Sequence, residues 1–236
     1  MKFPEYAIAI TGASGVLYGI RLVKVLIEKK IPLYLTLSES ATIVLREEMN
    51  LNLGERSQWE KHLLKYLGYS KSDIIQYLDE RDIAAPISSG SHKIKGMAVV
   101  PCSMSTLSGI ACGSSSNLIE RAADVILKEG RKLILVPRET PLSVIHLENM
   151  LKLAKLGVHI LPASPGFYHR PKRVKEVVDF IVGRVLDLMG VEHDLFQRWK
   201  IQVKDPIHQG VGMAKGGRSA LKELLQDRVL ESKRRV

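Results

Sequence analysis

Short apolar runs alternate with longer amphipathic segments along most of the chain, and this alternation restricts the fold. The apolar runs, which have the length and near-continuous hydrophobicity of strands buried on both faces, cover residues 6–10, 32–37, 95–100, 132–136 and 158–161. The amphipathic segments, which repeat apolar residues at helical spacing, cover residues 16–30, 40–49, 117–130, 143–156 and 174–189. Strands and helices in this order form right-handed crossovers, so we predict an α/β fold. Its core is a doubly wound parallel sheet in three layers, with helices on both faces.

One domain and a basic extension account for the 236 residues. We expect the domain to span residues 1–200, with a polar peripheral part at 50–94. The extension at 201–236 is expected to hold a short helix from about Ala220. No apolar run reaches the roughly 18 residues that a membrane-spanning helix needs, and the first residues lack a signal-peptide pattern. With only two cysteines the chain is typical of a cytoplasmic protein, and its net charge of +10 suits an anionic partner.

Hydroxyl-bearing and charged residues follow the predicted strands. In an open parallel sheet, ligands bind at the edge where the carboxyl ends of the strands meet. The segments at that edge are residues 11–15, 38–40, 101–106, 137–140 and 162–168. Four of them are rich in hydroxyl groups, and the segment at 137–140 holds Arg138 and Glu139. Hydroxyl groups, backbone N–H groups and helix N-termini together form phosphate sites, so we predict a phosphate-bearing ligand here.

Gly12 and Gly15 stand where the first strand turns into the following helix. Glycine permits a positive φ angle and a close approach of a ligand to the backbone. The segment lacks the G-x-G-x-x-G pattern of dinucleotide sites, which favours a mononucleotide, although a turn required only for packing is the alternative. Arg121 lies in the first turn of its helix, where a cation opposes the helix dipole. It therefore indicates a nearby anion, or else it is an ordinary surface residue.

Seven segments, in this order along the chain, resemble the flavin prenyltransferases of the UbiX/Pad type. They are TGASG (11–15), YG (18–19), PCS (101–103), SNLIERAADV (116–125), VPRETP (136–141), HLENM (146–150) and ASPGFYH (163–169). Each segment alone is a modest signal, but the ordered set is specific. The resemblance covers roughly residues 5–200 and says nothing about the residues beyond them.

The resemblance implies a flavodoxin-like Rossmann fold that binds FMN without a metal ion. Enzymes of this type transfer the dimethylallyl group of dimethylallyl monophosphate to N5 and C6 of reduced FMN, which adds a fourth ring and releases phosphate. The prenylated flavin then serves a UbiD-type decarboxylase as partner. The resemblance also implies a homo-dodecamer, with flavin sites between subunits.

The resemblance also assigns roles to single residues. FMN is expected to touch Gly12, Ala13, Ser14, Ser38, Ser103, Met104, Ser105, Thr106 and Arg121. The prenyl phosphate is expected to be held by Lys128, Arg138, Tyr168 and Arg184, partly from neighbouring subunits. Proton transfer is expected from Ser14, Glu48 and Glu139. The segment at 103–106 departs from the commonest wording of the family, which often has a glycine at position 104 or 105, but contacts through the backbone would survive that change.

Three other functions were compared with prenyl transfer. The first is an FMN-dependent decarboxylase of the cysteine-decarboxylase type, but the chain lacks the Asn-Met-x-x-Met-Trp-like substrate segment of that group. The second is a non-catalytic FMN carrier. The third is a nucleic-acid-binding protein, suggested by the positive charge. Aromatic residues make up only 6% of the chain and are not interleaved with basic residues, as binding to single strands requires.

Overall fold

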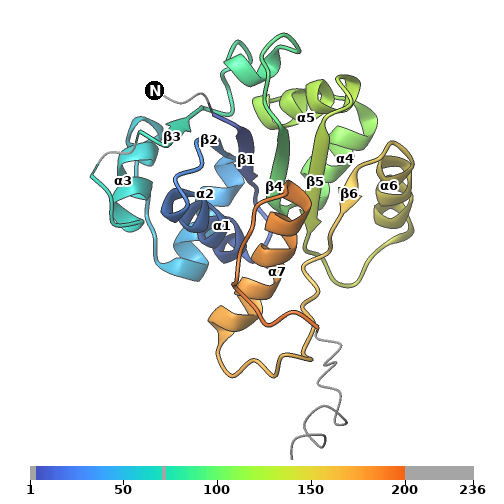
Figure 1. Cartoon of the computed structure of the whole chain (residues 1–236). Helices are drawn as coiled ribbons and strands as arrows, with labels where there is room; N and C mark the ends of the chain where they lie inside the picture. The colour runs from blue at the N-terminus through green and yellow to red at the C-terminus, as the bar shows by residue number, and fades with distance from the viewer. Residues whose placement is uncertain (1–3, 71–72, 200–236) are drawn as a thin grey trace, which may run out of the picture. The chain divides into compact units, whose positions relative to one another are not determined.

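A computed structural model describes residues 4–70 and 73–199, and it contains a six-stranded parallel sheet in the order β3-β2-β1-β4-β5-β6 (Figure 1). The strands are β1 (Tyr6–Ile10), β2 (Leu33–Leu37), β3 (Ile75–Tyr77), β4 (Gly96–Cys102), β5 (Lys132–Pro137) and β6 (His159–Ile160). The chain adds strands outward on one side of β1, then returns and adds β4, β5 and β6 on the other side. The predicted doubly wound parallel sheet is confirmed, and the strand order reverses between β1 and β4.

Strand β1 is the centre of the sheet and is buried on both faces. Tyr6 pairs with Leu33 of β2 on one side and with Gly96 of β4 on the other. Side chains alternate between the faces of a strand, so Ile8 packs into one apolar cluster and Ala9 into the other. The sheet therefore separates two apolar layers, as continuous apolar strands predict.

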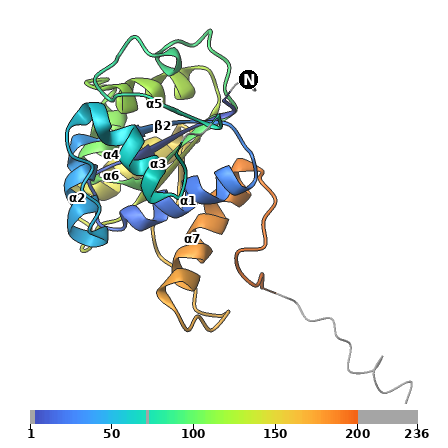
Figure 2. The same cartoon turned by 90° about the vertical axis from the view of Figure 1, so that its left-hand side faces the viewer.

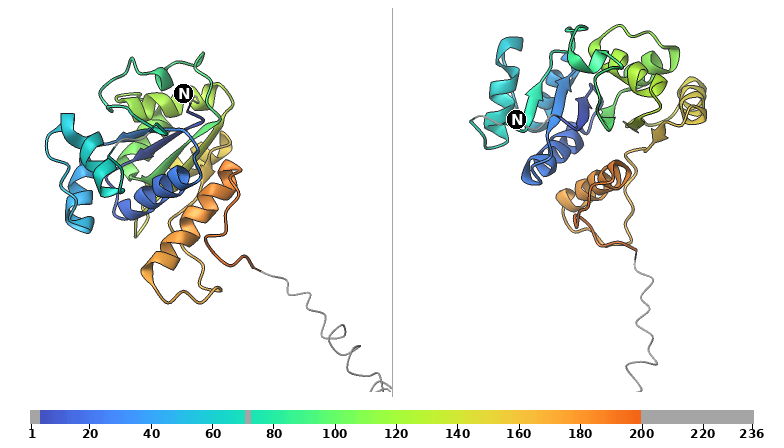
Figure 3. Two further views of the ribbon diagram at one scale, coloured as in Figure 1. Left: turned by 60° about the vertical axis from the view of Figure 1, so that its left-hand side comes forward. Right: turned by 45° about the horizontal axis from the view of Figure 1, so that its top comes forward.

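Helices cover both faces of the sheet. Helices α1 (Val16–Glu28) and α7 (Val174–Met189) lie side by side on one face, and α4 (Met104–Cys112) and α5 (Leu118–Lys128) cover the other (Figure 2). Helices α2 (Glu39–Met49) and α3 (Trp59–Tyr66) lie toward the β3 end of the sheet, and α6 (Val144–Lys155) lies beside β6 (Figure 3). Two 3₁₀ turns, η1 (Arg56–Gln58) and η2 (Pro86–Ser88), complete the described elements.

Two elements differ from the sequence-based expectation. Strand β3 has only three residues, too few for a periodic pattern to reveal it. Helix α4 begins inside the segment at 101–106, where the sequence pattern predicts no helix: Ser103 is its N-cap and Met104 its first residue. Its many Ser and Thr residues and an internal glycine weaken its helical signal, since such residues have poor helix propensity. The helix expected from about Ala220 lies outside the described residues.

Candidate active site

The turn after β1 is held by a carboxylate from α2. The backbone N–H of Gly15 donates to both carboxylate oxygens of Glu48, at 3.1 Å to Oε1 and 2.8 Å to Oε2. Gly15 has a φ angle of +94°, in the left-handed region where only glycine is relaxed. The predicted proton-transfer residues Glu48 and Ser14 therefore meet at this turn, because Ser14 directly precedes Gly15.

The same turn packs closely against the end of β2. A Cβ atom on Gly12 would lie 2.3 Å from the Oγ atom of Ser40, so no larger residue fits without movement. Ser38 is the N-cap of α2: its Oγ accepts from the backbone N of Ala41 at 3.1 Å and lies 2.9 Å from the Oγ of Ser40. Packing alone thus requires Gly12, and the predicted flavin residues at positions 12 and 38 lie next to each other.

The ends of β1 and β4 are joined by a buried threonine. Thr11 donates from Oγ1 to the carbonyl oxygen of Pro101 at 2.9 Å, and the same Oγ1 accepts from the backbone N of Ser103 at 2.8 Å. The Oγ of Ser103 in turn accepts from the backbone N of Thr106 at 3.3 Å and caps α4. The predicted flavin segment at 103–106 therefore forms the N-cap and first turn of α4, at the carboxyl edge of the sheet beside the end of β1.

A buried carboxylate secures the start of α5. Glu120 is 7% exposed, and its Oε2 accepts from the backbone N of Ser116 at 2.9 Å and from the hydroxyls of Ser114 and Ser116. Burial raises the pKa of Glu120, but these hydrogen bonds together lower it further, so the net pKa lies below its usual range. The next residue, Arg121, remains partly exposed, and its Nη1 lies 3.2 Å from Asp124 Oδ2.

Arg138 connects the segment after β5 to the turn after β1. Its Nε donates to the backbone carbonyl oxygen of Ser14 at 3.1 Å. Tyr18 lies close by: burial raises its pKa, the Arg138 charge lowers it and the Glu48 charge raises it, with a net upward shift. Tyr18 belongs to the YG segment that carries the family resemblance, but the sequence assigned it no role of its own.

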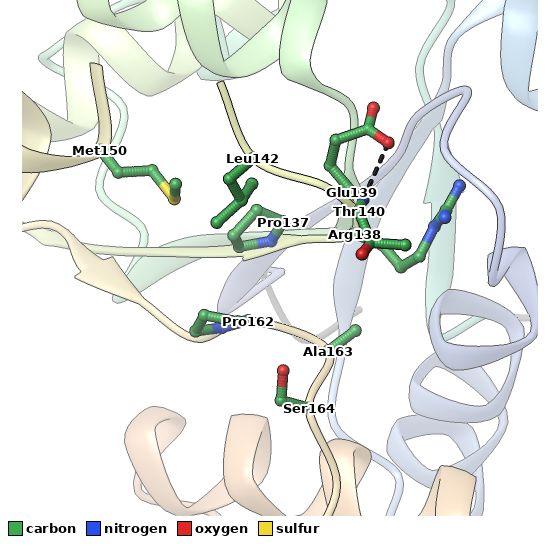
Figure 4. A pocket seen from close by; sticks show the side chains of 9 residues that line it. All are labelled: Pro137, Arg138, Glu139, Thr140, Leu142, Met150, Pro162, Ala163 and Ser164. Atoms are coloured by element: carbon green, nitrogen blue, oxygen red, sulfur yellow. Dashed lines mark hydrogen bonds between the residues drawn. The ribbon is translucent and has the colours of Figure 1, made fainter. Parts of the chain in front are cut away.

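A hollow of about 270 Å³ opens beside Arg138 (Figure 4). Glu139 lies on its wall, and one of its carboxylate oxygens accepts from the backbone N of Thr140 at 2.9 Å. Apolar side chains form most of the remaining wall of the hollow, with Leu142 and Met150 on one side. The hydroxyl of Ser164 lies on the other side. A cation, an acid and an apolar wall therefore meet in one place.

Tyr168 belongs to an aromatic cluster that covers α7. Its ring lies edge-on to His169 at 5.6 Å and to Phe180 at 5.8 Å, measured between ring centroids. The ring of His169 stacks parallel on Phe180. Tyr168 keeps 40% of its surface exposed. Like Ser164, it lies in the segment that follows β6. The cluster fixes the segment that follows β6.

Two predicted phosphate residues do not join this group within one chain. Lys128 is the last residue of α5, shortly before β5 begins beside the first residue of β4, at the opposite edge of the sheet. Arg184 lies in the second half of α7, where its Nη1 pairs with Asp187 Oδ2 at 3.0 Å. The last residue of that helix, Met189, accepts a hydrogen bond from Tyr6 at the start of β1. Both cations therefore lie toward the amino edge.

Three further findings concern the described residues. Burial raises the pKa of the Cys102 thiol strongly, which opposes a role as thiolate nucleophile. Among residues 4–70 and 73–199, no three His, Cys, Asp or Glu side chains are grouped so that they could hold a metal ion. Within the same ranges, none of the helices has the length and hydrophobicity to cross a membrane.

Comparisons with known proteins agree on one family. The model of the flavoprotein family matches residues 2–186. A flavin prenyltransferase UbiX of Halalkalibacterium halodurans is 50% identical over 194 residues, which are 82% of this chain and 92% of the relative. The flavin prenyltransferase UbiX of Pseudomonas aeruginosa is 46% identical over 201 residues, which are 84% of this chain and 96% of the relative.

Solved structures show the same relationship. A crystal structure of AnUbiX (PadA1) in complex with FMN and dimethylallyl pyrophosphate superposes with a TM-score of 0.73 at 38% identity, covering 84% of this chain and 98% of that one. A dodecameric FMN-dependent UbiX-like decarboxylase of Escherichia coli O157:H7 superposes with a TM-score of 0.72 at 42% identity, covering 83% and 98%. The chain therefore belongs to the flavoprotein family and, within it, to the flavin prenyltransferases of the UbiX type.

Proposed function

We propose that this enzyme binds reduced FMN at the carboxyl edge of its sheet and transfers to it the dimethylallyl group of dimethylallyl monophosphate. The hydrogen bond from Arg138 Nε to the Ser14 carbonyl carries this proposal. It places a cation between the turn assigned to the flavin and the hollow that Glu139 lines. A phosphate leaving group and a flavin ring can therefore be held side by side.

The flavin is assigned to the ends of β1, β2 and β4. Backbone N–H groups and hydroxyls are provided there by Gly12, Ala13, Ser14, Ser38, Ser103, Met104, Ser105 and Thr106, and Arg121 adds a cation from α5. The N-termini of α4 and α5 point toward the same edge. Helix N-termini and cations favour an anionic group such as the phosphate of FMN.

Arg138 and Tyr168 are assigned to the prenyl phosphate. In the reaction the allylic C–O bond breaks and its electron pair leaves with the phosphate, while a C–N bond forms at N5 and a C–C bond forms at C6. Basic groups that neutralise the phosphate lower the energy of this step. Leu142 and Met150 supply apolar surface beside the position assigned to the allylic carbon.

Three proton movements accompany the two new bonds: N5 and C6 each lose a proton, and the former double bond of the prenyl group gains one. Glu139 lines the hollow and is placed to move a proton at the prenyl group or the phosphate. Ser14 and Glu48 meet at the flavin turn and are assigned to protons there. Each proton-transfer group of this kind contributes about 10²- to 10⁴-fold to a rate.

Lys128 and Arg184 are assigned to the prenyl phosphate of a neighbouring copy. Within one chain both lie away from Arg138, and α6 leaves four apolar side chains exposed: Val144, Ile145, Leu147 and Leu151. An apolar helix face of this kind is typical of a subunit interface. Together with the dodecameric relative from E. coli, this supports a homo-dodecamer in which copies complete one another's sites.

The product is assigned to a UbiD-type decarboxylase, which would use the prenylated flavin as its cofactor. Anaerobic incubation of the protein with reduced FMN and dimethylallyl monophosphate, followed by mass spectrometry of the extracted flavin, tests the transfer. We expect a flavin that is heavier by one five-carbon unit. Unmodified FMN after incubation contradicts the proposal and favours an FMN carrier, while release of CO2 from a cysteine-terminated peptide favours the decarboxylase.

A further inference from the structure

Glu80, which follows β3, connects the N-termini of two helices. Its Oε1 accepts a hydrogen bond at 2.7 Å from the backbone N of Glu39, the first residue of α2. Its own backbone carbonyl accepts one at 2.7 Å from the backbone N of Leu118, the first residue of α5. The first N–H groups of a helix have no partner within the helix. One buried residue, 9% exposed, therefore satisfies one such group in each of two helices.

These two helices come from different layers of the fold. Helix α2 packs through Ala41 and Leu45 into the apolar cluster on one side of the sheet, and α5 packs through Leu118 into the cluster on the other side. No sheet hydrogen bond can fix the position of one helix relative to the other. The two bonds of Glu80 provide a direct connection between them.

Both helices carry residues assigned to the flavin. Ser38, the N-cap of α2, is adjacent to Glu39, whose N–H binds the Glu80 carboxylate. Arg121 lies in the first turn of α5, close to Leu118. Glu80 therefore links the two segments that carry Ser38 and Arg121.

A partly buried arginine contacts the Glu80 side chain. Arg56 Nη2 lies 3.5 Å from Glu80 Oε1 and 2.9 Å from Glu39 Oε2, and its Nη1 lies 2.8 Å from Asp79 Oδ1. The guanidinium also lies over the Trp59 ring, 4.3 Å from the centroid. Burial lowers the pKa of Arg56, but the carboxylates raise it further, so the side chain stays charged and keeps all three pairs.

We propose that Glu80 is a positioning residue for the flavin, which sets the distance between Ser38 and Arg121 without touching the cofactor. The inference rests on the proposed assignment of these two residues to FMN. Without the Glu80 carboxylate, the N–H of Glu39 loses its partner and only the backbone bond to α5 remains. The first turn of α2 then loses its fixed position relative to α5.

The test compares Glu80→Ala, Glu80→Gln and, as a matched control, Asp82→Ala, which removes a carboxylate that accepts from the nearby Ala84 backbone N. The dissociation constant of FMN is measured by quenching of flavin fluorescence. We expect it to rise about tenfold in Glu80→Ala, the effect of one lost charge-assisted hydrogen bond. Glu80→Gln keeps an oxygen that can accept, so it should stay within roughly threefold, and Asp82→Ala should equal wild type.

Kinetics separate positioning from general loosening of the fold. With FMN at saturation, Glu80→Ala should keep its kcat and its KM for dimethylallyl monophosphate within about twofold of wild type. An unchanged dissociation constant for FMN in Glu80→Ala overturns the inference. So does a parallel rise of the FMN dissociation constant and of the KM for dimethylallyl monophosphate together with a lower melting temperature. If Glu80→Ala does not fold, Glu80→Asp, which cannot reach Glu39, replaces it with the same expectation. A wild type that binds FMN but transfers no prenyl group refutes the proposed function only, because the affinity comparison does not depend on turnover.

Discussion

The two halves of the carboxyl edge are built differently. On the side of β1 and β2, hydrogen bonds within one chain fix the segments assigned to the flavin: Gly15 binds Glu48, Ser38 binds Ser40, and Thr11 joins β1 to β4. On the side of β5 and β6, the hollow is open, and side chains such as Leu142 and Tyr168 remain exposed.

This difference bears on which contacts to the flavin and to the prenyl group one chain can make by itself. The turn assigned to the flavin is already formed, so ordering it on binding would cost little conformational entropy. The prenyl side offers one arginine and one glutamate, while two further cations lie at the opposite edge. We infer that flavin binding depends mainly on contacts within a chain, and that prenyl transfer depends on the assembly.

The most sensitive test of the difference is Glu139→Gln. The amide keeps the size of the side chain but cannot take up a proton, so we expect kcat to fall by about 10²-fold or more. The dissociation constant of FMN should stay within about twofold, because the Glu139 carboxylate accepts from its own loop at Thr140 and is assigned to the prenyl side. Quantification of prenylated flavin gives the rate, and Glu148→Gln on exposed α6 serves as control. A large rise in the dissociation constant of FMN would show that the proton-transfer role assigned to Glu139 is wrong.

Mixed assemblies test whether copies share the prenyl site. Arg138→Ala and Lys128→Ala should each raise the KM for dimethylallyl monophosphate by roughly 10- to 100-fold, since each removes a charge-assisted bond to phosphate. If one site combines Arg138 of one copy with Lys128 of another, assemblies formed from equal amounts of both variants should contain about a quarter of intact sites.

Reassembly should therefore restore part of the wild-type rate at low substrate. Separate solutions of the two variants, combined without reassembly, are the control. No recovery after verified mixing would mean that both residues act within one chain or that Lys128 has no role.

Alanine substitutions at two glycines test whether the turn assigned to the flavin has to be rigid. Gly15 and Gly68 both have left-handed φ angles, +94° and +90°, but a Cβ on Gly15 would meet the Tyr18 ring at 2.8 Å, whereas one on Gly68 would meet nothing within 4 Å. Alanine at either position should cost about 1–2 kcal/mol of unfolding free energy. Gly15→Ala should cost more and should also weaken FMN binding. Urea unfolding and FMN titration check this, and equal losses in both assays would deny the turn a special role.

The smallest expected effect concerns the pH dependence of Glu120. Its pKa is lower in the folded protein than the ordinary value of 4.5, so the carboxylate stabilises the fold above that pH. The stabilisation is lost as the pH falls through the lowered pKa. Glu120→Gln should be less stable than wild type at pH 7, and the gap should narrow under acid. Urea unfolding between pH 7 and pH 3 checks the trend; a constant gap would contradict it.

Much of the fold could be predicted because its signal is local. The apolar runs of β1 and β5 and the caps at Ser143 and Asn117 specify strands and helices residue by residue. Helix α4 could not be predicted in this way, because its stability comes from packing Leu107 and Ile110 against the sheet rather than from propensity. Strand β3 likewise exists because β2 offers it a partner.

The candidate site was predictable only in part. That strand ends meet at one edge follows from parallel topology, so residues such as Ser38 and Arg138 could be selected from the sequence. The bonds between Gly15 and Glu48 and between Glu39 and Glu80 join residues about 30 to 40 positions apart in the chain, and no periodicity encodes them. The positions of Lys128 and Arg184 toward the other edge follow from the helices predicted at 117–130 and 174–189, which the structure contains. Whether a neighbouring copy brings them to a prenyl site is not encoded in these helices.

Arg138 is anchored to the carbonyl oxygen of Ser14 and not to its hydroxyl. Every amino acid has that carbonyl, so the anchor does not depend on which side chain occupies position 14. The hydroxyl can therefore be removed or replaced by another polar group while the guanidinium keeps its place. Position 14 thus offers a way to change the proton transfer assigned to Ser14 without moving the guanidinium assigned to the leaving group, both for natural divergence among relatives and for deliberate redesign.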